Sequence, residues 1–325
     1  MREVQFNPEV KLFLADVDET VADVYTPATP EMITELTTLL EEGRSIFFVS
    51  GTSFARIKQR VIDSIPQPLR RGILVSHCSG AEVWGYDEAG NLRAEPFYSL
   101  YDATLDEAQK TKWREIVQQL ITEFQLEPHN ATNVKEFKEK VGDNPLAIML
   151  DDRGPQITFE FVNGYDLTPE QEAALEVSVP QTHGALDLRI PVLERTDQLL
   201  QAANIPITPR LGGIFALDLA LKGVSKTESI KHLLENDHVL HSIGLSRQEL
   251  ENPEYLEIWG DRFDRFRGGT DRHMQEAVSP DVRAIDFREE NPEGFMQGYN
   301  TVLWDGSKHL HDGLLEYLQS RHRGA

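Results

Sequence analysis

The chain has 325 residues, of which 40% are hydrophobic and 26% charged, a balance that suits one large globular domain or two ordinary ones. Its formal net charge of -22 argues against a general nucleic-acid partner, because phosphate backbones are bound by clustered Lys and Arg. No stretch approaches the roughly 20 apolar residues that cross a bilayer, so no membrane partner is expected. A single cysteine, Cys78, and an N-terminus without signal-peptide features favour a cytoplasmic location.

The first ninety residues alternate between short apolar runs and segments with helical spacing of apolar residues. Continuous apolar runs are typical of strands that are buried on both faces of a parallel sheet. Together they predict a β-α-β-α-β start with right-handed crossovers. The expected strands are 10–17, 44–51 and a run from 72 that continues into a hairpin, and the expected helices are 29–43 and 52–65.

The pattern changes between about 90 and 220. An amphipathic helix is expected over 111–125, a hairpin of two strands over 146–162, a short helix over 197–205 and a strand over 212–221. Helices on an antiparallel sheet make an α+β unit.

The alternation of helix and strand then resumes, which indicates that the α+β unit is inserted into a single α/β domain. The expected helices are 226–236, 272–278 and 313–320, and the expected strands are 255–261 and 282–287. The sequence therefore predicts an α/β fold with a doubly wound parallel sheet in residues 1–89 and 221–325, and an inserted α+β domain in 90–220.

Asp16 and Asp18 end the first apolar run. Ligands of open α/β sheets bind outside the carboxyl ends of the strands, and residues two apart on a strand face the same way. Two carboxylates this close repel each other unless a cation lies between them, and Mg²⁺ suits an oxygen-only site that also meets a phosphate. One Asp could attack phosphorus while the other serves as acid and base. Glu19 would then point elsewhere and be solvated. The alternative interpretation is a loop rich in acids after the strand, with an Asp capping the next helix.

Two later segments could bind the phosphate. Ser50, Gly51 and Thr52 follow the second strand and offer hydroxyl and backbone N–H groups, although taken alone they favour an ordinary Ser/Thr helix cap. Lys226 is the first residue of a predicted helix, where a cation interacts unfavourably with the helix dipole. Binding of a phosphoryl group would explain a lysine at this position. Lys222 is the rival candidate.

Asp261 and Asp271 supply further acids near the end of a later strand. The Asp261 carboxylate could complete the cation site, with Asp271 nearby. The alternative is a surface loop in which neighbouring arginines and acids pair among themselves.

These four segments, in this order, resemble the motifs of the haloacid dehalogenase (HAD) superfamily of phosphohydrolases and phosphomutases. Asp16, Asp18 and Thr20 match its Asp-x-Asp-x-Thr motif. The later motifs are matched by Ser50, with Thr52 as a rival, by Lys226, and by the acidic pair Asp261 and Asp271. The inserted unit resembles a cap of the C2 type, as in subfamily IIB. Within the superfamily the chain is most similar to eukaryotic-type phosphomannomutases and their bacterial phosphatase relatives.

The resemblance implies that Asp16 is the nucleophile and Asp18 the acid and base. It implies Mg²⁺ bound by Asp16, Asp261 and the backbone carbonyl of Asp18, with Asp271 nearby. The chain departs from the family pattern at Glu19, where Gly is usual, and at Thr270, where Asn is usual. Such caps confer substrate specificity, and the cationic candidates in the inserted unit are Arg153 and Arg189, although a solvated arginine is the favoured interpretation for both.

The expected activity is that of a Mg²⁺-dependent phosphatase acting on a small phosphorylated metabolite, with a sugar phosphate as the favoured class. A phosphomannomutase-like sugar phosphomutase is the alternative, since both reactions share the aspartyl-phosphate. A non-catalytic binding protein on the same scaffold is a third hypothesis, motivated by Glu19 and Thr270. The sequence leaves the oligomeric state open, with a homodimer as one option.

Overall fold

The computed structural model divides the chain into two compact units, residues 1–99 with 224–325 and residues 100–223. The boundaries expected from the sequence were 89/90 and 220/221. Among the described residues, no helix combines the length and apolar character needed to span a membrane. The structure describes residues 4–131, 133–165, 167–173, 181–182, 185–212, 215–266, 269–288 and 292–322.

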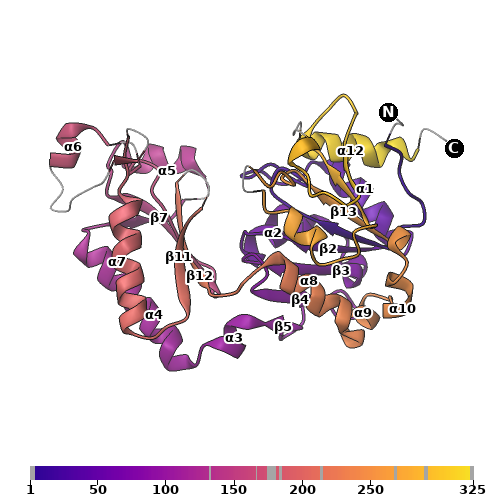
Figure 1. Ribbon diagram of the computed structural model, residues 1–325, viewed down its shortest axis with the longest axis horizontal. Coiled ribbons are helices and arrows are strands. Elements are labelled where there is room, and N and C mark those ends of the chain that lie inside the picture. The colour runs from indigo at the N-terminus through magenta and orange to yellow at the C-terminus, as the bar shows by residue number, and fades with distance from the viewer. Residues whose placement is uncertain are drawn as a thin grey trace. The chain divides into compact units, whose positions relative to one another are not determined.

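The first unit is built on an eight-stranded sheet in which neighbouring strands are parallel from β15 to β3, while β4 and β5 are antiparallel (Figure 1). This is the expected α/β fold class. In spatial order the strands are β15 (Thr301–Leu303), β14 (Arg283–Asp286), β13 (Leu256–Gly260), β1 (Leu12–Ala15), β2 (Ser45–Val49), β3 (Ile73–His77), β4 (Glu82–Gly85) and β5 (Tyr98–Ser99).

Helices cover both faces of this sheet, which explains the continuous apolar runs in its strands. Phe13 and Ala15 of β1 belong to one core cluster, and Leu12 and Leu14 belong to another. Alternating residues of a strand face opposite ways, so each face of β1 is packed. The first cluster includes residues of α1 (Pro30–Glu41), α2 (Phe54–Arg60) and α12 (Leu310–Ser320), and the second those of α8 (Lys226–Glu235), α9 (Asp237–Ser242) and α11 (Arg272–Gln275), with α10 (Arg247–Leu250) packed beside it.

The strand order places a change of winding direction at β1. From β1 the chain proceeds through β2 to β3 on one side, and later through β13 to β15 on the other. At such a point the connections leave in opposite directions, and a crevice opens outside the carboxyl ends of the strands. Asp16 follows β1 and Asp261 follows β13, so both acids lie at this crevice.

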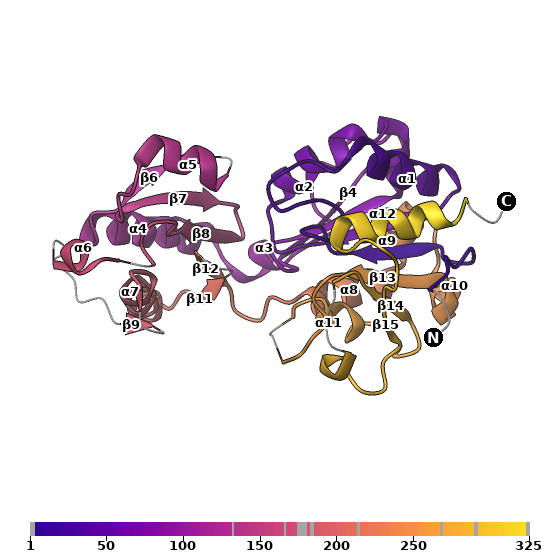
Figure 2. The same ribbon diagram turned by 90° about the horizontal axis from the view of Figure 1, so that it is seen from above.

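The second unit contains a five-stranded sheet that is antiparallel except for its β6–β7 pair (Figure 2). Its strand order is β11 (Ile207–Gly212), β12 (Ala216–Leu221), β8 (Gln156–Glu160), β7 (Ala147–Asp152) and β6 (Glu127–His129). Its other elements are α3 (Leu100–Thr104), α4 (Glu107–Glu123), α5 (Val134–Val141), α6 (Pro169–Ala173), α7 (Arg189–Ala202) and the small pair of β9 (Gln181–Thr182) and β10 (Ala185–Leu186).

Two of the elements in this unit that differ from the expected ones contain a proline in a permitted position. Helix α7 begins at Arg189, eight residues before the expected start at 197. Pro191 does not prevent this, because it lies within the first turn of the helix, where the missing N–H costs no intrahelical hydrogen bond. Strand β11, which contains Pro209, was not expected. It is an edge strand, and there proline is tolerated.

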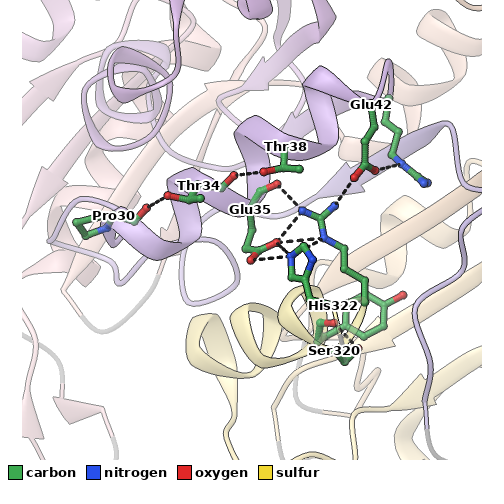
Figure 3. Close-up of polar contacts among 10 residues, drawn as sticks. Pro30, Thr34, Glu35, Thr38, Glu42, Ser320 and His322 are labelled. Carbon is green, nitrogen blue, oxygen red and sulfur yellow. Dashed lines mark hydrogen bonds and ion pairs between the residues drawn. The ribbon is translucent and has the colours of Figure 1, made fainter. Parts of the chain in front are cut away.

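The C-terminal residues after α12 fix the first unit's α1 through a buried carboxylate. Glu35 of α1 accepts hydrogen bonds from the Arg321 guanidinium at 2.7 Å and from His322 Nε2 at 3.1 Å. Arg321 also reaches Glu42 at 3.3 Å. Figure 3 shows Glu35, Glu42 and His322 converging at this contact. The chain end therefore neutralises a charge that α1 buries against α12.

Replacing Arg321 with Met is expected to lower the free energy of unfolding by about 3 kcal/mol, because Glu35 would remain buried without its main partner. Urea denaturation measures this. The matched control is Arg247→Met, whose more exposed pair with Asp237 predicts a loss below about 1 kcal/mol. Equal small losses in both variants would contradict a supporting role for the buried pair.

Candidate active site

Four charged side chains from three distant segments meet at the carboxyl edge of the core sheet. Asp16 follows β1, Asp261 follows β13, Asp271 precedes α11, and Lys226 is the first residue of α8. All four are at least 93% buried. The structure therefore brings together the acids and the lysine that the sequence placed in separate motifs. Lys222, the rival lysine, is exposed and belongs to the other unit.

Lys226 links two of the acids directly. Its Nζ lies 2.6 Å from Asp16 Oδ1 and 2.8 Å from Asp271 Oδ1. Burial alone would lower the pKa of Lys226, but the neighbouring carboxylates of Asp16 and Asp271 outweigh it and raise that pKa. The lysine is therefore a permanent cation held inside the acidic group.

The backbone also holds Asp271. Its Oδ2 accepts hydrogen bonds from the backbone N–H groups of Asp261 and Arg262, both at 3.0 Å. Its other oxygen accepts from Lys226. Both oxygens of Asp271 are thus oriented by the fold, which keeps it beside Asp261.

Three carboxylates fit a divalent cation. Asp16, Asp261 and Asp271 each place an oxygen within 4.8 Å of the others. An all-oxygen donor set with several negative charges is the kind that Mg²⁺ prefers, with water and substrate oxygens as its remaining ligands. Burial, followed by the charge of Asp271, raises the pKa of Asp261 to about 6, while Arg288 opposes the shift. Burial likewise raises the pKa of Asp16, with Lys226 opposing and the neighbouring acids reinforcing it. A cation in this place would relieve the repulsion.

Binding of Mg²⁺ is expected to weaken as the pH falls through about 6, because the cation must displace a proton from Asp261. Well below that pH the affinity should fall about tenfold per pH unit for each displaced proton. Isothermal titration with MgCl₂ between pH 5 and pH 8 measures this. The stability of the cation-free fold has the opposite pH dependence. The folded chain holds these protons more tightly than the unfolded chain, so their contribution to the free energy of unfolding is lost as the pH rises through about 6. A Mg²⁺ affinity that does not change from pH 5 to pH 8 would contradict the assignment.

Asp261 has two further neighbours. Its Oδ2 accepts from Arg288, whose Nε lies at 3.1 Å, and its Oδ1 accepts from the Thr20 hydroxyl at 3.4 Å. Thr20 is fully buried. The threonine of the Asp-x-Asp-x-Thr motif thus links the segment after β1 to the acid that follows β13.

Asp18 lies outside this group of three carboxylates. Its Oδ1 accepts from Arg60 Nη1 at 2.6 Å, and its Oδ2 accepts from Ser50 Oγ at 3.2 Å. Arg60 also donates to the backbone carbonyls of Thr26 and Ala22. The last residue of α2 therefore holds both the Asp18 carboxylate and the loop that follows it. The expected contribution of the Asp18 backbone carbonyl to the cation stays a prediction.

The segment between β2 and α2 is organised by Ser50. Its hydroxyl accepts the N–H of Thr52 at 3.1 Å while donating to Asp18. Helix α2 begins at Phe54 with Ser53 as its N-cap, so Gly51 and Thr52 precede the helix instead of lying in its first turn. Ser50 therefore links this segment to an acid of the motif. The phosphate-binding roles of all three residues stay predictions.

Glu19 adopts a left-handed backbone with φ of 64°, where a glycine would be unstrained. The motif that this segment resembles usually has Gly at this position, and the left-handed backbone explains that preference. Glu19→Gly is expected to raise the free energy of unfolding by about 0.5 kcal/mol, because relief of the left-handed strain exceeds the added freedom of the unfolded chain. Thermal or urea unfolding measures it. A destabilisation above about 1 kcal/mol would show instead that the Glu19 side chain supports the fold.

The two arginines of the second unit that the sequence offered as candidates, Arg153 and Arg189, are held by neighbouring acids. Arg153 Nε lies 2.9 Å from Asp151 in the turn between β7 and β8. Arg189 makes a buried pair with Asp187, with Nη2 at 2.8 Å from Oδ2. A substrate role for either arginine stays a prediction.

Sequence reasoning missed Arg60 and Arg288, which contact Asp18 and Asp261. Arg60 is 42 positions from Asp18 and Arg288 is 27 from Asp261. Neither arginine belongs to a local motif. Arg60 lies inside the helix expected over 52–65 and Arg288 directly follows the strand expected over 282–287, and neither position signals a contact with an acid.

No protein-family model and no curated protein sequence matches this chain. Solved structures do resemble it. A haloacid dehalogenase-like hydrolase from Bacteroides thetaiotaomicron has 14% identity and a TM-score of 0.56, over 95% of this chain and 98% of that one. The C-terminal domain of trehalose-6-phosphate phosphatase from C. albicans has 14% identity and a TM-score of 0.52, over 96% and 92%. A trehalose-6-phosphate phosphatase related protein has 11% identity and a TM-score of 0.51, over 96% and 97%.

These likenesses extend over nearly the whole chain and show its fold, which is that of haloacid dehalogenase-like hydrolases. The expected likeness to that superfamily is therefore confirmed for the fold. The narrower expectations, subfamily IIB and similarity to phosphomannomutases, stay predictions.

Proposed function

We propose that this chain is a Mg²⁺-dependent phosphatase that hydrolyses a small phosphorylated metabolite through an aspartyl-phosphate on Asp16. The observation that carries the proposal is the buried group in which Lys226 bridges Asp16 and Asp271 beside Asp261, at the carboxyl edge of a parallel sheet. Burying a lysine among three acids carries a large desolvation penalty, so such a group is a poor way to stabilise a fold. A site that must hold both a cation and a phosphate needs both signs of charge.

The residues would divide the reaction into two steps. A carboxylate oxygen of Asp16 attacks phosphorus, the bond from phosphorus to the ester oxygen breaks, and Asp18 gives a proton to the leaving oxygen. Water then attacks the same phosphorus, Asp18 takes the proton, and inorganic phosphate leaves as the Asp16 carboxylate is regenerated. Ser50 and Lys226 would hold the phosphoryl oxygens and offset their charge in both transition states.

Asp16, Asp261 and Asp271 would hold Mg²⁺, with the backbone carbonyl of Asp18. When bound, the cation would neutralise charge on the phosphoryl oxygens. Arg60 is a positioning residue in this scheme, because it fixes the Asp18 carboxylate through the 2.6 Å contact.

The inserted unit, residues 100–223, would select the substrate as a cap, with Arg153 and Arg189 as its cationic candidates. Two of the structural neighbours bear names that refer to trehalose-6-phosphate phosphatase, which supports sugar phosphates as the first substrates to try.

Phosphate release from a panel of sugar phosphates and related esters, with Mg²⁺ and with EDTA, tests the proposal. Release that requires Mg²⁺ is the expected result, and its relative rates rank the substrates. Silence across the panel would count against the phosphatase. A phosphomutase would instead convert mannose 1-phosphate only with a sugar bisphosphate present, and a binding protein would bind esters without converting them.

A further inference from the structure

Each of the three carboxylates that could hold the cation already has an oxygen engaged by a donor of the chain. Asp16 Oδ1 accepts from Lys226 Nζ at 2.6 Å. Asp271 accepts from Lys226 through Oδ1 and from two backbone N–H groups through Oδ2. Asp261 accepts from Arg288 through Oδ2. Because chelation by a carboxylate needs both of its oxygens, these contacts favour coordination through a single oxygen of each acid.

The guanidinium of Arg288 closes on one oxygen of Asp261. Its Nε and Nη2 lie at 3.1 and 2.5 Å from Asp261 Oδ2, and the same Nε lies 3.1 Å from the backbone carbonyl of Asp261. Asp261 Oδ1 instead has the Thr20 hydroxyl at 3.4 Å, which is longer than an ordinary O–H···O hydrogen bond. Oδ1 is therefore the oxygen that Asp261 can offer to a cation without losing its arginine contacts.

The backbone on both sides of this contact is fixed. The N–H of Arg288 donates to Asp286 Oδ1 at 2.8 Å, and Asp286 is fully buried at the end of β14. The N–H of Phe287 donates to the carbonyl of Gly260 at 2.9 Å, which joins the segment after β14 to the residue before Asp261. Two paired strands thus present the guanidinium to Asp261, although 38% of the Arg288 side chain is exposed.

Mg²⁺ and Ca²⁺ use carboxylates differently. Mg²⁺ is small and demands a nearly ideal octahedral shell, whereas Ca²⁺ takes roughly six to eight oxygens and often binds both oxygens of one carboxylate. A site that withholds the second oxygen of each acid therefore penalises Ca²⁺ more than Mg²⁺. Lys226 contacts two of the acids, while Arg288 contacts Asp261, so substitution of Arg288 frees one oxygen and leaves the lysine in place.

We infer that Arg288 is a positioning residue, which restricts Asp261 to a single oxygen toward the cation and thereby makes the site discriminate against Ca²⁺. The inference rests on the cation site of the proposed function but not on catalysis, because it concerns binding of the metal alone. An arginine that served only as a counter-ion would weaken the binding of both cations alike.

Isothermal titration with MgCl₂ and, separately, with CaCl₂ at pH 8 gives the ratio of the two association constants. Arg288→Met is expected to shift this ratio toward Ca²⁺ by about tenfold, a size typical of removing the outer partner of a metal ligand. Loss of the positive charge alone should strengthen the binding of both cations, so the ratio carries the test. Arg288→Gln repeats the measurement with a polar side chain in case Arg288→Met disturbs folding.

The matched control is Arg262→Met. Burial is the main cause that raises the pKa of Asp261, and Arg262 opposes that rise through its charge. Arg262 is exposed, and within the described part of the chain its side chain makes no hydrogen bond to that carboxylate. Its substitution should strengthen the binding of both cations and leave their ratio unchanged.

A ratio in Arg288→Met within about twofold of the wild-type ratio would overturn the inference, and so would an equal shift in Arg262→Met. If the wild-type protein bound neither cation, the cation site would be wrong and the inference with it. Phosphate release enters none of these titrations. A protein that released no phosphate but showed the expected ratios would therefore contradict the phosphatase and still support the role of Arg288.

Discussion

Asp16→Asn is expected to reduce phosphate release by roughly 10⁴-fold or more, because the amide cannot act as the nucleophile that accepts the phosphoryl group. The substitution keeps the shape of the side chain and the position of the backbone N–H, which donates to the carbonyl of Trp259 at 2.9 Å. It removes one of three mutually repelling carboxylates, so no loss of stability is expected. The measurement is the initial rate on the best substrate of the panel.

The matched control for that variant is Asp281→Asn, at an exposed position ten residues after Asp271 that belongs to none of the motifs. It should retain wild-type activity. If Asp16→Asn kept activity within about tenfold of wild type while the control was unchanged, the account would be contradicted. Either another residue would be the nucleophile, or water would attack phosphorus directly.

Lys226→Met is expected to destabilise the Mg²⁺-free protein by about 3–5 kcal/mol, because Asp16 and Asp271 would lose the cation that contacts both. Methionine approximates the length of the aliphatic stem, so the change mainly removes charge. The same variant should lose phosphatase activity by about 10³-fold, since no cation would offset the phosphoryl charge from that side. Urea denaturation and initial rates measure the two effects.

Added Mg²⁺ should restore part of the stability of Lys226→Met, because it offers positive charge to the same carboxylates. Lys222→Met, which alters the exposed rival lysine, is the control and should change neither quantity appreciably. Wild-type stability in Lys226→Met without Mg²⁺ would show that the acids are protonated and need no partner.

The core strands were predictable because burial on both faces leaves a continuous apolar run. β1, β2 and β13 all lie within the expected ranges, and all their residues are buried. The second unit was less predictable. Its short strand β6 (Glu127–His129) carries no apolar run. Pro191 and Pro209 suggest the end of a helix and of a strand, although each occupies a position where proline is permitted.

The convergence of the site was predictable for a topological reason. The carboxyl ends of parallel strands share one edge, so acids that end β1 and β13 must lie near each other. The partners Arg60 and Arg288 were not predictable, because a long side chain can reach an acid from many positions. The left-handed backbone of Glu19 was also hidden, since a glutamate gives no sign of positive φ.

The most direct test of the central claim is to locate the phosphoryl group on the protein during turnover. The wild-type protein would be mixed with Mg²⁺ and its best substrate, quenched in acid within milliseconds, digested and analysed by mass spectrometry. The account predicts one phosphoryl group on Asp16, present only with substrate and missing from Asp16→Asn. Rapid turnover with no phosphoryl group on Asp16, or with one on another residue, would contradict it.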